Sequence, residues 1–302
     1  MPKCVVIFSY TDDRPGELKK NYVFAKMTVN ELLECKKEKG KAYLFFLSRD
    51  FRANEIEAKK IDSDKAVIYI LSDHEPSELP VNVHFFDPYG SSARIYWQKY
   101  PVTKPYEKIL LIGSGKFAGA LLETAFTNNV FNTLQKISYT AFGDWNRFLE
   151  NHPYLEDYLN GDKSDFCDKI EFQDKSWKSD IEMLSKADRI IICHDDPALN
   201  NEALSELRRY FPTQAAVYAR TDHAEEEAVL FGSGDDIYFP ETVMRMKLND
   251  AAIKLHNYYL QSSGGSLPDW NRLGTFLRRS NEASADHMKV KLRILTDRKS
   301  VV

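Results

Sequence analysis

The chain has little that would place it in a membrane, in an oxidising compartment or on nucleic acid. No apolar run approaches the roughly 18–20 residues that a membrane-spanning helix requires. Its four cysteines are far apart and form no CxxC pair, so we expect reduced thiols in a cytoplasmic protein. The 41 basic and 45 acidic residues give a net charge of -4, which predicts neither a nucleic-acid nor a membrane partner.

Recognisable catalytic and metal-binding motifs are also missing. The sequence has no HExxH motif, no GKS or GKT ending of a Walker A loop and no GxSxG nucleophile elbow. The N-terminal stretch MPKCVVIFSY has one lysine before a short strand-like run, which is not the pattern of a signal peptide. We therefore expect no metal site, and an enzyme is the alternative hypothesis rather than the leading one.

What the sequence does contain is apolar residues arranged as alternating strands and helices. Hydrophobic residues make up 43% of the chain and aromatic residues 13%, which is enough for two or three globular domains. The alternation predicts an α/β fold with parallel sheets that helices cover on both faces. We expect strands at 4–10, 42–47, 66–71, 83–86, 109–112, 136–141, 169–172, 189–193, 215–219, 229–231 and 237–239.

Helical periodicity accompanies these strands and then takes over near the C-terminus. We expect helices at 18–32, 56–60, 117–125, 144–149, 179–186, 199–211 and 241–260, and further helices that start near 269 and 280. The proline-containing stretch 101–105 predicts a domain boundary. We predict three domains: a Rossmann-like α/β domain without a glycine fingerprint at 1–100, a nucleotide-binding Rossmann domain at 106–240, and a small all-α domain at 241–302.

The stretch 108–130 organises the second domain, because an apolar strand ends in glycines that lead into a helix. Gly113 allows a tight turn, Gly115 lets the backbone approach a pyrophosphate, and either Ala118 or Gly119 lets helix and strand pack closely. The predicted cofactor-binding residues of this loop are Gly113, Ser114, Gly115, Lys116, Phe117 and Gly119. The alternative is a turn that has kept its shape and lost its ligand.

A second polar cluster follows the buried strand at 189–193. Asp195 and Asp196 would lie at the carboxyl edge of the sheet, where open α/β sheets bind ligands, and either carboxylate suits a ribose hydroxyl. A structural interpretation competes with this one, since Asp196 before Pro197 is a typical helix N-cap. His194 beside two carboxylates leaves a metal or acid–base role as a third possibility.

The region 106–240 resembles the TrkA-N or RCK domain of potassium channels and transporters. The resemblance is carried by the residues from Ile112 to Gly119 and from Ala187 to Cys193. It implies a Rossmann fold that binds NAD(H) or another adenine nucleotide, and a homodimer. The sequence departs from this family after the second strand, where no carboxylate precedes Asp144 to hold a ribose.

The region 243–296 resembles the RyR domain, a small module repeated in ryanodine receptors and present in bacteria. The residues that carry this resemblance are 252–256, 276–287 and the pair Lys291-Leu292. The resemblance implies a small-ligand pocket formed by Arg278, Asn281, Asp286 and His287. The alternative is structural: Ser280 caps a helix, Asp286 and the arginines form exposed ion pairs, and His287 packs.

Together these features predict a ligand-sensing regulatory protein that binds an adenine nucleotide or dinucleotide. The resemblances imply a place in a bacterial defence or signalling system. An enzyme that acts on a nucleotide or uses NAD(H) is the alternative, motivated by His194 beside Asp195 and Asp196. A scaffold without a small ligand is the third hypothesis.

Overall fold

The computed structural model describes residues 5–6, 23–24, 42–48, 50–61, 66–72, 80, 82–132, 134–155, 168–232 and 248–299. The chain divides into two compact units, each made of two separate stretches. Unit 1 comprises Met1–Ser91 and Gly234–Ala285, and unit 2 comprises Ser92–Ser233 and Asp286–Val302. The C-terminal stretch therefore contributes to both units.

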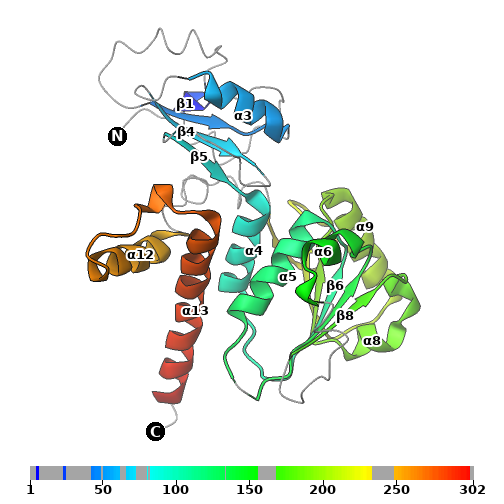
Figure 1. The fold of residues 1–302 in the computed structure, drawn as a ribbon. Helices are drawn as coiled ribbons and strands as arrows, with labels where there is room; N and C mark the ends of the chain where they lie inside the picture. The colour runs from blue at the N-terminus through cyan, green and yellow to red at the C-terminus, as the bar shows by residue number, and fades with distance from the viewer. Residues whose placement is uncertain are drawn as a thin grey trace. The chain divides into compact units, whose positions relative to one another are not determined.

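Unit 2 is built on a parallel sheet of six strands (Figure 1). The strands are β6 (Lys108–Ile112), β7 (Ser138–Phe142), β8 (Lys169–Gln173), β9 (Arg189–Ile192), β10 (Ala216–Arg220) and β11 (Val229–Phe231). Their spatial order is β11-β10-β9-β6-β7-β8, and all neighbouring pairs are parallel. Counted from β6, this is the order 3-2-1-4-5-6 of a doubly wound dinucleotide-binding sheet. The predicted α/β class with parallel sheets is confirmed.

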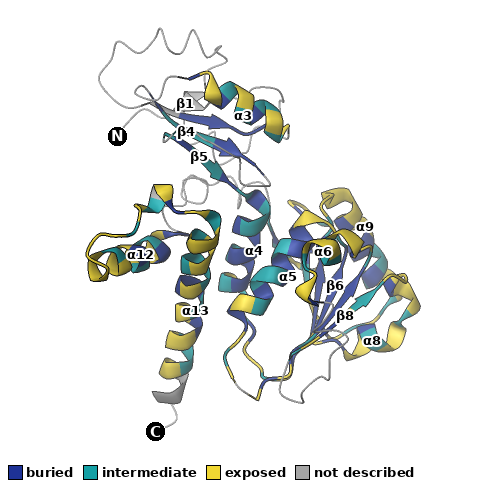
Figure 2. Cartoon of the chain, in the orientation of Figure 1, coloured by how far each residue is buried: buried dark blue, intermediate teal, exposed yellow. Residues whose placement is uncertain are grey.

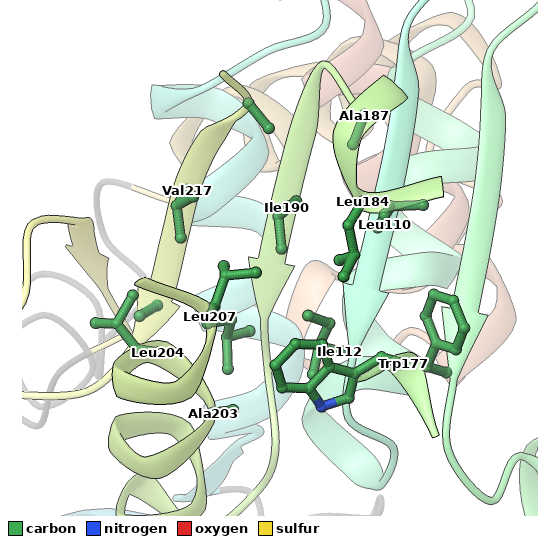
Figure 3. Packing of buried hydrophobic residues seen from close by; sticks show 14 residues of the cluster. Leu110, Ile112, Trp177, Leu184, Ala187, Ile190, Ala203, Leu204, Leu207 and Val217 are labelled. Atoms are coloured by element: carbon green, nitrogen blue, oxygen red, sulfur yellow. The ribbon is translucent and has the colours of Figure 1, made fainter. Parts of the chain in front are cut away.

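One face of this sheet is covered by α9 (Pro197–Tyr210), whose apolar residues recur at helical spacing. Leu204 and Leu207 of α9 join a buried cluster with Ile112 of β6 and Ile190 of β9 (Figure 3). Burying each such side chain contributes about 1.5–3 kcal/mol. The other helices of unit 2 include α5 (Lys116–Asn128), α6 (Asn146–Asn151), η2 (Trp177–Ser179) and α8 (Ile181–Lys186).

Residues of α4 (Pro88–Lys99) pack beside α5. The Trp97 Nε1–H donates to the Leu121 carbonyl of α5 at 2.8 Å, and Tyr96 is buried with its ring 4.6 Å from that of Phe231. No helix is expected here from the sequence, and Gly90 and the serines that follow it do have low helix propensity. Aromatic burial against the sheet overrides that local preference.

The stretch that follows α4 is held by a buried arginine at the start of β9. Arg189 donates to the Glu107 carboxylate at 2.6 Å and to the backbone carbonyls of Tyr100 and Pro101 at 2.7 and 3.3 Å. Burial raises the pKa of Glu107, although the Arg189 charge opposes that shift. This ion pair fixes the predicted boundary stretch 101–105 to the base of the sheet.

Unit 1 contains a second parallel sheet in the order β3-β4-β5. Its elements are β3 (Ala42–Phe46), β4 (Ala66–Leu71), β5 (Val83–Phe86) and the helix α3 (Phe51–Lys59). A separate parallel pair joins β1 (Val5–Val6) to β2 (Val23–Phe24). The helix expected at 18–32 is therefore wrong at Val23–Phe24, where a β-branched and an aromatic residue favour a strand.

The C-terminal part of the chain forms α12 (Asp250–Ser262), the short η3 (Trp270–Arg272) and α13 (Thr275–Lys299). The expected helix start at Ser280 is wrong, because α13 is already continuous from Thr275. Asn281 is accommodated inside it since its Nδ2 donates to the Leu277 carbonyl one turn earlier at 2.9 Å. The assignment of this region to a separate all-α RyR-like module stays a prediction.

The central strands of the six-stranded sheet are mostly buried, whereas α13 carries many exposed residues (Figure 2). The central strands β6 and β9 are buried along almost their whole length. On α13, by contrast, Phe276, Met288 and Leu292 are exposed. None of the helices in the described part of the chain has the length and apolarity needed to cross a bilayer.

Candidate functional site

The glycine loop and the His194-Asp195-Asp196 turn meet at one point of the six-stranded sheet. Ile112, the last residue of β6, pairs with Ile192, the last residue of β9. The loop after β6 leads into α5, and the turn after β9 leads into α9. The strand order reverses between these two strands, which is where doubly wound sheets open a crevice for ligands.

Gly113 and Gly115 both have backbone conformations that other residues rarely adopt. Their φ angles are +121° and +123°. A Cβ on Gly113 would lie 2.7 Å from the backbone nitrogen of His194, and a Cβ on Gly115 would lie 2.5 Å from Oδ2 of Asp195. The two glycines therefore let the turn after β9 pack directly on the loop. The space that the sequence analysis assigns to a pyrophosphate at Gly115 holds the Asp195 carboxylate.

Asp195 caps the N-terminus of α5 from 79 residues away along the chain. Its Oδ2 accepts a hydrogen bond from the Lys116 backbone N–H at 3.0 Å, and its Oδ1 accepts one from the Phe117 N–H at 2.9 Å. Gly115, the N-cap residue, has no side chain for this purpose. A carboxylate is favourable here because these amides and the helix dipole present positive charge.

The backbone of the turn is held by two side chains from neighbouring elements. The buried Asn200 of α9 accepts from the His194 N–H at 2.7 Å and donates to the carbonyls of His194 and Arg220 at 2.9 and 2.7 Å. Arg220 of β10 donates to the Asp195 carbonyl at 2.8 Å and lies over the Phe117 ring at 4.8 Å. The turn is thereby fixed to α9, β10 and α5.

Asp196 and Gly119, both expected to contribute to the site, make structural contacts instead. Asp196 caps α9 by accepting from the Ala198 N–H at 2.9 Å, and Pro197 follows it in the first turn, so the capping interpretation is confirmed. Gly119 faces α6 rather than the strand, since a Cβ there would lie 3.0 Å from the Phe148 ring. Of the two residues expected to allow close packing on the strand, Gly119 therefore does not, and Ala118, which is buried, remains.

Three basic side chains lie at or near the glycine loop: Lys116, Arg147 and His194. Lys116 is exposed at the start of α5, and both burial and the nearby Arg147 charge lower its pKa, while Asp195 opposes the shift. Burial also lowers the pKa of His194, although Asp195 and Asp196 act against it. At neutral pH the imidazole is therefore uncharged. Among the described residues no three His, Cys, Asp or Glu side chains are grouped so that they could hold a metal ion.

The residues that follow β7 lie beside the glycine loop. Gly143 has a φ of +132°, and a Cβ there would lie 3.0 Å from the Ser114 hydroxyl. The next residue, Asp144, is exposed, and its Oδ1 accepts from the Asn146 N–H at 3.1 Å. Asp144 is therefore the first carboxylate after the second strand of the sheet, two residues beyond the strand end where nucleotide-binding Rossmann folds place a ribose contact.

The residues expected to form a ligand pocket in the RyR-like region make other contacts. Asp286 is buried and accepts from the Arg94 Nε at 2.6 Å and from Gln98 at 3.0 Å. The expectation of exposed ion pairs is therefore wrong for Asp286. His287 is hydrogen-bonded through Nε2 to the Val130 carbonyl at 2.6 Å. In unit 2, both residues attach α13 to α4 and to the end of α5.

The other two predicted residues of that pocket lie in unit 1. Arg278 donates to the Leu273 carbonyl at 2.9 Å, and its guanidinium lies 5.8 Å from the centre of the Phe85 ring. Asn281 bonds within its own helix. The division of the chain therefore places Arg278 and Asn281 in one unit and Asp286 and His287 in the other.

Sequence reasoning missed the partnership between Asp195 and the N-terminus of α5, and the clamp made by Asn200. The local pattern shows a polar turn after a buried strand, which is the correct signal for a sheet edge. It does not show which strands are neighbours, and only the order of β6 and β9 brings these residues together.

Comparison with known proteins gave no match: no family model matches the chain, and no curated protein or solved structure is significantly similar to it. The resemblances to the TrkA-N and RyR domains therefore stay predictions from the residues that carry them.

Proposed function

We propose that this protein is a ligand-sensing regulatory protein that binds an adenine nucleotide or dinucleotide between β6 and β9. One observation carries the proposal: a strand–glycine turn–helix unit lies at the switch point of a parallel sheet with the order 3-2-1-4-5-6. Doubly wound sheets bind ligands at this point, and the amides of a helix start favour an anionic group.

The residues around the loop fit a nucleotide in two of three respects. Lys116 and Arg147 supply positive charge for phosphate, and Asp144 supplies a carboxylate for the ribose hydroxyls. NAD(H) is one ligand with this chemistry. The helix start is the feature that does not fit a bound phosphate, because the first two amides of α5 already donate to Asp195. A phosphate gains these donors only when that carboxylate leaves.

A regulatory role is supported by what contacts α5 at its middle and just beyond its C-terminal end. The helix starts at the proposed site, its Leu121 carbonyl accepts from Trp97 of α4, and the Val130 carbonyl just beyond it contacts His287 of α13. A ligand that shifts α5 would strain both contacts. We propose that α4 and α13 transmit ligand binding, and that the RyR-like region takes part in the response.

The enzyme alternative is favoured by one observation, the uncharged and partly buried His194 beside two carboxylates at the sheet edge. Such an imidazole could accept a proton from a bound substrate. Incubating the full chain with labelled NAD and ATP distinguishes the two: a labelled product favours the enzyme, and binding without product favours the sensor.

The binding proposal is tested by calorimetric titration of the full chain with ADP and NAD. Lys116→Glu should weaken ADP binding about tenfold or more, because it replaces an attractive charge with a repulsive one. The matched control is Lys136→Glu, which makes the same change at an exposed residue two positions before β7, at the amino-terminal edge of the sheet and so opposite the proposed site. Equal losses in both variants, or no binding to the wild-type chain, would contradict the proposal.

A further inference from the structure

We propose that Asp195 is an internal competitor for the phosphate of the ligand: its carboxylate holds the phosphate position in the unliganded protein and is displaced on binding. This inference rests on the proposed function, and it adds the regulation of the same site. It makes Asp195 a specificity-determining residue that sets the ligand concentration to which the protein responds.

The first step of the argument is the geometry of the carboxylate. Its two oxygens take the two successive amides of Lys116 and Phe117, at 3.0 and 2.9 Å. An anion that accepts hydrogen bonds from the backbone amides of a helix start is the arrangement in which such a start binds phosphate. The absence of a side chain at Gly115 makes room for it, since a Cβ would lie 2.5 Å from Oδ2. One anion at a time fits this place.

The second step is that the carboxylate can leave without moving the backbone. Asp195 is exposed, so turning its side chain into water carries little desolvation cost. The carbonyls of His194 and Asp195 are held separately by Asn200 and Arg220. Displacement therefore needs only a side-chain rotation, and the glycine loop keeps its shape.

The third step concerns the charge that stays behind. With the carboxylate turned away, the two α5 amides and the Lys116 charge are left at the vacated position, and the Arg147 charge lies close to Lys116. They favour an entering phosphate, but the ligand must first compete with an anion that is tethered in place. Phosphorylated ligands should therefore bind more weakly to the wild-type protein than to a variant without the Asp195 charge. The affinity for a phosphate-free nucleoside should be the same in both.

The test is calorimetric titration of the full chain with ADP, inorganic pyrophosphate and adenosine. Asp195→Asn keeps the shape of the side chain and removes its charge, and Asp195→Ser is a second neutral variant with a shorter side chain. We expect both variants to bind ADP and pyrophosphate about tenfold more tightly than wild type, because a charged hydrogen-bond acceptor is replaced by a neutral one. Adenosine affinity should not change.

The matched control is Glu202→Gln, which removes one negative charge from an exposed position on α9 and should change ADP affinity less than about twofold. If wild type binds ADP while both Asp195 variants bind it equally or more weakly, the competitor role is overturned and the proposed function stands. If neither wild type nor any variant binds a nucleotide or pyrophosphate, both proposals are overturned. Equal tightening by Glu202→Gln would also overturn the inference, because it would attribute the effect to net charge.

Discussion

The strand–helix–strand segments β3-α3-β4 in unit 1 and β9-α9-β10 in unit 2 use the same clamp. In unit 1, the buried Asn54 accepts from the Ser48 N–H at 3.1 Å and donates to the Ser48 and Leu71 carbonyls at 2.8 and 3.0 Å. In unit 2, Asn200 makes the corresponding three bonds to His194 and Arg220. Each asparagine follows its first partner by six residues and ties two strand ends together.

The helix caps repeat as well. Asp50 accepts from the Ala53 N–H at 3.0 Å at the start of α3, and Asp196 accepts from the Ala198 N–H at the start of α9. The residue before the cap differs: it is Asp195 in unit 2, and in unit 1 it is Arg49, which lies outside the described residues.

This comparison separates the fold from the candidate site. A clamp present in both segments is a device for joining parallel strands, so Asn200 does not by itself indicate a ligand. The glycine loop and Asp195 occur only in the unit 2 sequence pattern. The loop that follows the first expected strand of unit 1, at 11–16, has no glycine fingerprint and lies outside the described residues. Function is therefore best tested by substituting Gly115 and Asp195.

The largest expected effect tests the shared clamp. Asn200→Ala and Asn54→Ala each remove three hydrogen bonds from buried backbone groups, so each should lower the free energy of unfolding by about 3 kcal/mol. Urea denaturation of the full chain, monitored by circular dichroism, measures both. A loss below about 1 kcal/mol in only one variant would contradict the comparison, because the two asparagines would then contribute differently to stability.

A smaller effect is expected at the glycine that unit 2 alone places against an aspartate. Gly115→Ala should cost about 2–3 kcal/mol, since φ is +123° and the new Cβ would meet Asp195. Gly264→Ala in unit 1 is the matched control. Its φ is also positive, at +68°, but a Cβ there would have nothing within 4 Å, so it should cost only about 1 kcal/mol.

The Asp195 contribution to that difference can be isolated with a second change. Gly115→Ala should cost less in the Asp195→Ala background than in the wild-type background, because the steric part of the loss is then absent and only the part due to φ remains. Thermal unfolding of both single variants and of the double variant measures this, with Asp195→Ala as the reference because it also removes the cap of α5. An equal cost of Gly115→Ala in the two backgrounds would mean that the Asp195 side chain does not require a glycine at position 115.

Local patterns predicted the strands well and the site only in part. The expected strands at 66–71 and 83–86 coincide with β4 and β5, because continuous apolar runs bounded by polar residues identify buried strands. The polar turn at 194–196 was correctly placed at a sheet edge. Contacts across the chain were not predictable: Asp195 reaches α5 only through the order of the strands, and Asp286 pairs with Arg94 at a separation of 192 residues.

The smallest expected effect lies at the first partner of each clamp, which is His194 in unit 2 and Ser48 in unit 1. Burial lowers the pKa of His194 below its ordinary value of 6.5, so below that pH the unfolded chain binds a proton that the folded chain does not. Stability should therefore fall as pH drops below about 6.5, and it should level off once His194 is protonated in the folded state. His194→Ser, which copies unit 1, should remove this part of the decline while leaving the part due to His84, whose pKa is also lowered by burial. Urea denaturation of both chains at pH 7.5 and 5.5 measures the difference, and parallel loss of stability in the two would mean that the histidine turn does not sense pH.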